Sequence, residues 1–112
     1  MGKKEVRDIL LAIFLILYVV FSVSLLYRNN ILVTILVLIG CAIGLWFWHE
    51  KEDVACFIIV MIAGSLSEIL TIHFGVWTYT HPSFLGIPIW LVPLYGVNII
   101  AVRRIAYSIL HL

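Results

Sequence analysis

Long runs of apolar residues without a charge constrain this chain more than any other feature of its sequence. Four such runs occupy residues 9–27, 31–48, 54–74 and 87–102, and a single acid, Glu68, interrupts the third. A helix needs about 20 apolar residues to cross the roughly 30 Å hydrocarbon core of a bilayer. The runs do not alternate with polar residues, as the strands of a membrane barrel do. We therefore predict an all-α integral membrane protein, a four-helix bundle in a single transmembrane domain.

The composition excludes several other classes of protein. Of the 112 residues, 64% are hydrophobic and 12% are charged, and the net charge is +1. A soluble domain carries about 25% charged residues, twice the share present here. A nucleic-acid binder needs an excess of cations to neutralise phosphates. The sequence thus excludes a soluble enzyme and a nucleic-acid partner, and it predicts the lipid bilayer as the surroundings of the chain.

Lysine and arginine residues are distributed unequally over the predicted connections. Both termini and the connection at residues 49–53 share one side, which holds six of these residues, whereas Arg28 alone lies on the other side. Because cytoplasmic loops carry the excess of Lys and Arg, both termini are predicted to be cytoplasmic. Residues 75–86 then form an external loop rich in aromatic side chains, which suit a membrane interface. The predicted interface residues are Trp77, Tyr79, His81 and Trp90.

Polar residues within the predicted spans gather in the outer half of the membrane. At 1.5 Å per residue, Glu68 lies about 9 Å below the outer end of its helix, Tyr95 about 10 Å and Asn98 about 15 Å. A carboxyl group at this depth costs a few kcal/mol unless it is protonated or paired. The functional interpretation is a proton donor or a polar ligand site, and the structural one is a carboxyl that bonds Ser22 or Tyr95 and fixes helix register. The other members of this predicted cluster are Ser22, Ser67, Thr71 and His73.

Two groups of small residues predict close helix packing. Gly40 and Gly44 form a GxxxG pattern in the second run, and Ala63, Gly64 and Ser67 lie in the third. Such residues let helices approach closely in lipid. We expect one group to pack within the bundle and the other to face a neighbouring subunit. The spacing of the histidines matches no zinc or copper pattern, so the sequence predicts neither a metal site nor a cofactor.

One segment resembles a known family. Glu68, the sequence FGVWTY at 74–79, and GIP at 86–88 followed by Trp90 are similar to membrane carotenoid-biosynthesis proteins of the bisanhydrobacterioruberin hydratase type. The resemblance covers residues 68–90 only, and members of that family are longer, with more spans. It implies an isoprenoid substrate and acid chemistry on an alkene, for which a protonated Glu68 is the donor.

Three functional hypotheses follow. The first is an accessory or structural subunit of a larger membrane complex, such as a membrane oxidoreductase, which needs no catalytic activity of the chain's own. The second is a protein or enzyme that binds an isoprenoid or another lipid at Glu68, Tyr95 and Asn98. The third is a dimeric proton-coupled transporter that uses Glu68. In length and layout the chain resembles the small multidrug transporters, although their membrane glutamate lies on the first helix.

Overall fold

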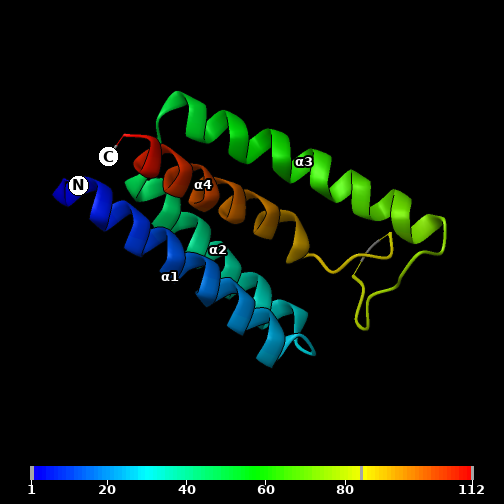
Figure 1. Cartoon of the computed structure of the whole chain (residues 1–112). Helices are drawn as coiled ribbons and strands as arrows, with labels where there is room; N and C mark the ends of the chain where they lie inside the picture. The colour runs from blue at the N-terminus through cyan, green and yellow to red at the C-terminus, as the bar shows by residue number, and fades with distance from the viewer. Residues whose placement is uncertain (1, 84, 112) are drawn as a thin grey trace.

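The computed structural model describes residues 2–83 and 85–111, and these residues form four helices (Figure 1). The helices are α1 (Lys3–Leu26), α2 (Asn30–Phe47), α3 (Lys51–His73) and α4 (Leu91–Leu110). Three of them, α1, α2 and α3, are long and apolar enough to cross a membrane. The all-α class is therefore confirmed, and the three apolar helices support a membrane location.

Helices α2 and α3 begin and end close to the predicted limits, whereas α1 begins at Lys3 rather than at residue 9 and α4 differs at both ends. The predicted span started at residue 87, whereas α4 starts at Leu91 and continues to Leu110. The residues just before Leu91 form a turn. Pro93 lies in the first turn of α4, where backbone N–H groups have no partner within the helix, so proline costs no hydrogen bond there. Residues 87–90 are as apolar as the helix that follows, so hydropathy alone placed the start too early.

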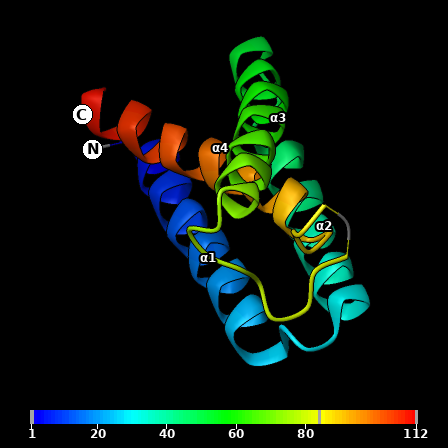
Figure 2. The same ribbon diagram turned by 90° about the vertical axis from the view of Figure 1, so that its right-hand side faces the viewer.

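The helices are arranged around α4, which packs against each of the other three (Figures 1 and 2). Helix α1 also packs against α2, whereas α3 packs mainly on α4. The fold is thus a three-helix bundle of α1, α2 and α4 with α3 along one side, and α3 is less enclosed than a symmetric four-helix bundle predicts. Both termini lie at the same end of the molecule, and the loop between α3 and α4 lies at the other.

The small residues mediate packing inside the chain. Gly40 and Gly44 are buried in α2, where an added Cβ atom would contact side chains of α1 and α4. Gly64 on α3 faces α4, while Ala63 and Ser67 are exposed. Close approach of backbones at small residues is how helices associate in lipid. The GxxxG pattern therefore serves the bundle itself, and only Ala63 and Ser67 of the second group point away from it.

The end that holds both termini contains buried charges. Asp53 is fully buried and pairs with both Arg103 and Arg104, of which Arg104 is only 2% exposed. Asp8 is also buried and accepts a hydrogen bond from the indole N–H of Trp48 at 3.1 Å. A buried charge is tolerated when it is paired and hydrogen-bonded. The Asp53 pairs join α3 to α4, and the bond to Asp8 joins α1 to the end of α2.

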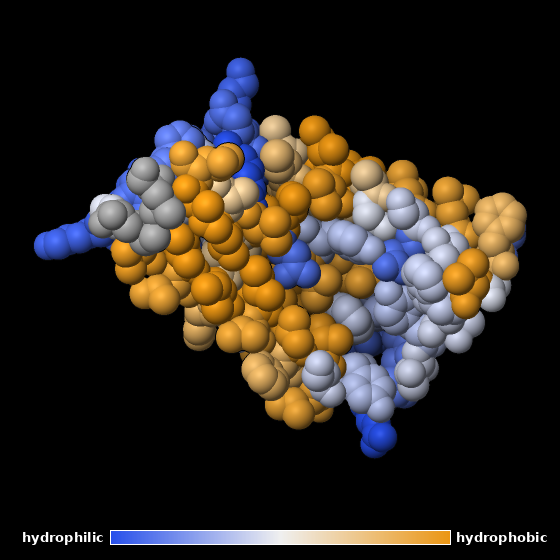
Figure 3. All heavy atoms as spheres, in the orientation of Figure 1, coloured by the Kyte–Doolittle hydropathy of each residue, from blue (hydrophilic) through white to orange (hydrophobic). Residues whose placement is uncertain are grey.

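The molecular surface is apolar along the helices and hydrophilic at the two ends (Figure 3). Helix α3 contributes strongly to the apolar surface, because only Asp53 and Ser65 are buried among its residues. Large apolar side chains such as Ile59 and Leu66 are more than half exposed on it. A surface of this kind suits a hydrocarbon environment rather than water.

Candidate functional site

The carboxyl group of Glu68 joins three elements at the loop end of the molecule. The hydroxyl of Tyr95 on α4 donates to its Oε1 at 2.6 Å, and the indole N–H of Trp77 in the loop donates to its Oε2 at 3.1 Å. Of the two partners expected for Glu68, Tyr95 is the one that bonds it, whereas the hydroxyl of Ser22 donates to the carbonyl of Tyr18 on its own helix. Both carboxyl oxygens therefore act as acceptors for groups of other elements.

Glycines bring α3 and α4 close enough for this contact. A Cβ atom on Gly64 would lie 2.5 Å from the ring of Tyr95, and one on Gly96 would lie 2.5 Å from the ring of Phe57. Each helix thus places an aromatic ring over a glycine of the other, and neither glycine has room for a side chain. The ring of Tyr95 lies flat enough on α3 for its hydroxyl to reach Glu68.

Tyr79 belongs to the same region of the loop. Its ring meets the ring of Trp90 edge-on at a centroid distance of 6.3 Å, a favourable geometry for aromatic pairs. Burial, and next the nearby charge of Glu68, raise the pKa of Tyr79 to about 12. The phenol therefore remains a neutral hydrogen-bonding group over the physiological pH range.

The remaining residues of the predicted polar cluster lie elsewhere. Ser67 and Thr71 donate to carbonyl groups of their own helix, and His73 is exposed at the end of α3. No hydrogen bond within the described part of the chain connects Asn98 with Glu68. The sequence did not predict that the loop supplies Trp77 to Glu68, because the depth of a residue along a helix does not indicate the path of a loop. The residues that the structure brings together, here called the Glu68 cluster, are Glu68, Trp77, Tyr79 and Tyr95.

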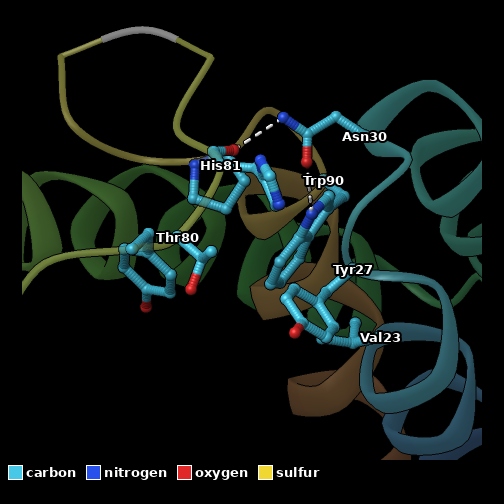
Figure 4. Close-up of a pocket in the computed structure, with 8 residues that line it drawn as sticks. Val23, Tyr27, Asn30, Thr80, His81 and Trp90 are labelled. Atoms are coloured by element: carbon cyan, nitrogen blue, oxygen red, sulfur yellow. Dashed lines mark hydrogen bonds between the residues drawn. The ribbon is translucent and has the colours of Figure 1, made fainter.

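Asn30, at the start of α2, holds the other side of the loop. Its Nδ2 donates to the carbonyl of His81 at 2.7 Å and to the hydroxyl of Ser83 at 3.0 Å. Its Oδ1 accepts from the indole N–H of Trp90 at 3.2 Å (Figure 4). Asn30 thus uses its whole amide to fasten the loop and the start of α4 to α2.

Two adjoining hollows lie beneath the loop, between α1 and α4, and we call them together the groove. The outer hollow has a volume of about 210 Å³ and the inner one about 290 Å³. Val23, Tyr79 and Trp90 line both. The outer hollow is also lined by Tyr27, Asn30, Thr80, His81 and Pro88 (Figure 4), and the inner one by Val19, Val20, Ser24, Leu91, Leu94 and Asn98.

Metal-binding groups do not converge on the groove. Among residues 2–83 and 85–111, no group of three His, Cys, Asp or Glu side chains lies close enough together to hold a metal ion. Cys41 is buried in α2 and Cys56 is half-buried in α3, and both are free thiols. The outer hollow thus offers hydroxyl, amide and imidazole groups beside apolar side chains, and the inner hollow is mostly aliphatic but includes the hydroxyl of Ser24 and the amide of Asn98.

Comparison with known proteins finds no relative of this chain. Neither the family models, nor the curated proteins, nor the solved structures contain a match to this chain.

Proposed function

We propose that this chain binds a lipid or isoprenoid with a polar head and an apolar tail, and that the ligand occupies the groove. The observation that carries the proposal is the lining of the groove, which is largely apolar along its length and has a few polar groups. Thr80 and His81 line its outer hollow, whereas aliphatic side chains such as that of Leu94 predominate in the inner one. Binding sites for small ligands are mostly apolar and orient their ligands through a few polar groups. A hydroxyl head near Thr80 and a tail beside Leu94 match this pattern.

The Glu68 cluster supports binding rather than acid chemistry. Both oxygens of Glu68 accept hydrogen bonds, from Tyr95 and from Trp77, so the carboxyl is occupied in holding the loop against α3 and α4. The charge of Glu68 contributes to the raised pKa of Tyr79, and Tyr79 lines the groove, so the cluster adjoins the wall of the groove. In this proposal Glu68 is a positioning residue that orders the aromatic wall, and the ligand lies on the other side of Tyr79.

Paired variants of α1 test the proposed function. Val23→Phe adds a ring to a wall that both hollows share, and Leu25→Phe adds the same ring where the side chain is 76% exposed. Octadecanol binding to the purified protein in micelles is measured for each. Because overfilling a packed site costs on the order of 1–3 kcal/mol, we expect Val23→Phe to raise the Kd about tenfold or more, with Leu25→Phe unchanged. Equal affinities in both variants would contradict the proposal.

We also infer that all four helices cross the membrane and that both termini are cytoplasmic. Helix α4 has 20 residues and therefore a length of about 30 Å, which is enough for one crossing. An even number of crossings agrees with the position of both termini at the same end of the molecule (Figure 1). That end carries the excess of lysine and arginine, which is typical of the cytoplasmic side. The groove then opens toward the outer leaflet.

The exposure of α3 favours a second candidate function, that of a subunit in a larger membrane complex. Helix α3 packs mainly on α4, and its outer face includes Leu66, which is 55% exposed. Native mass spectrometry of gently extracted protein would then detect a second subunit. We expect Leu66→Trp to release it and Leu17→Trp, on an equally exposed face of α1, to retain it. Detection of the chain alone would exclude this role.

A further inference from the structure

Asn98 is a polar side chain of α4 that the fold leaves without a partner. Its Oδ1 is buried, and no hydrogen bond reaches its amide from residues 2–83 or 85–111. Tyr95 lies three residues earlier on α4, and its hydroxyl donates to Glu68 instead. Asn98 contrasts with Asn30, whose amide is fully bonded. Nothing within the described chain therefore accounts for an amide at this position.

An amide without a partner is unfavourable in this environment. Burial of an amide without a hydrogen bond costs on the order of 1–3 kcal/mol in proteins, and more in pure hydrocarbon. Val19, Val20 and Leu94 line the inner hollow together with Asn98, so its surroundings there are mostly aliphatic. Polar side chains within a membrane protein's interior mark ligand or ion pathways when they are not used for packing. A bound ligand with its own hydrogen-bonding group would satisfy this amide.

The position of Asn98 along α4 gives the spacing that such a ligand needs. Trp90 is part of the outer hollow, and Asn98 lies eight residues further along the chain. At 1.5 Å per residue the two levels are about 12 Å apart. A simple alcohol with its head in the outer hollow presents only methylene groups at the level of Asn98.

We propose that the ligand of the groove carries a second polar group, a hydroxyl about 12 Å from its head, that donates a hydrogen bond to the Oδ1 of Asn98. The inference rests on the proposed function and adds the chemical class of the ligand, an amphiphile that is polar at two points. The aliphatic part between these points lies against Val20 and Leu94. The two hydrogen-bonding regions also fix the direction in which the ligand enters.

Two alcohols that differ by one hydroxyl test the inference. Octadecanol has a hydroxyl only at its end, and the matching octadecanediol has a second one on carbon ten. We expect the wild-type protein in micelles to bind the diol about tenfold more tightly than octadecanol, because one buried hydrogen bond is gained. Asn98→Leu should bind both alcohols with equal affinity. Equal affinities in the wild-type protein, or a preference that persists in Asn98→Leu, would overturn the inference.

A further pair of variants separates the two proposals from each other. Asn98 also borders a second hollow between α3 and α4, which Val60 lines. We expect Val23→Phe to weaken binding of the diol and Val60→Phe to leave it unchanged; the reverse result would place the ligand outside the groove and overturn the inference. If neither alcohol binds in a way that depends on Val23, the proposed function itself fails. If both bind there equally, only the second polar contact fails.

Discussion

At Gly64 the absence of a side chain determines how closely α3 approaches α4. A Cβ atom there would lie 2.5 Å from the ring of Tyr95, well inside van der Waals contact. We expect Gly64→Ala to push the ring away, to break its hydrogen bond with Glu68 and to lower the free energy of unfolding by about 1–3 kcal/mol. Unfolding in mixed micelles measures the effect. Ser67→Ala, exposed on the same helix, is the control and should change stability by less than about 0.5 kcal/mol.

Tyr79 gives the site a dependence on high pH. Burial and the charge of Glu68 raise its pKa from 10.0 to about 12, so the folded state holds the phenolic proton more tightly than the unfolded state. This contribution to stability is complete below pH 10 and is lost as the pH rises toward about 12. We expect the unfolding midpoint of the wild-type protein to fall over this range and that of Tyr79→Phe to fall less. Parallel curves for both proteins would refute the assignment.

Single residues also show what the sequence could predict of the site. The pairing of Glu68 with Tyr95 follows from their similar depths, because both lie on helices whose rise per residue is constant. The bond from Trp77 and the role of Asn30 do not follow, since both depend on the path of a loop. Asn98 was predicted near the same cluster, but depth does not specify which face of α4 it occupies.

At the scale of the helices, charge-free runs located α2, α3 and the end of α1 well, but they gave no information on which charges become buried. Glu50 and Asp53 form a capping box at the start of α3, and Asp53 then pairs with Arg103 and Arg104 of α4. This arrangement is non-local, since the partners are about fifty positions apart along the chain. In the sequence, charged residues that flank an apolar run look the same whether they are solvated or paired with one another in the fold.

The buried ion pairs give a prediction about the packing of α3. Asp53→Asn leaves Arg104, which is 2% exposed, with one charged partner fewer. Removing one member of a buried pair costs about 3–5 kcal/mol, so we expect a loss of unfolding free energy near the lower end of that range. Glu52→Gln, an exposed neighbour in the same turn, is the control and should be neutral. A loss equal to that of the control would mean that the pair does not hold α3 in place.

For the whole molecule, the orientation in the membrane is testable with accessible cysteines. Arg28 lies in the turn between α1 and α2, and Lys51 lies at the opposite end, at the start of α3. With both termini cytoplasmic, an impermeant thiol reagent added to intact cells should label Arg28→Cys and not Lys51→Cys. The two native cysteines lie within helices and serve as the background. Labelling of Lys51→Cys alone would reverse the proposed orientation.

The central claim is that an amphiphile lies in the groove between α1 and α4. Photo-cross-linking of an octadecanol that carries a diazirine in its chain, followed by peptide mass spectrometry, tests it most directly. We expect label on Val23 and Leu94, which line the groove. Label concentrated on Leu10, Ile59 and Leu66, which are the more exposed to surrounding lipid, would contradict it.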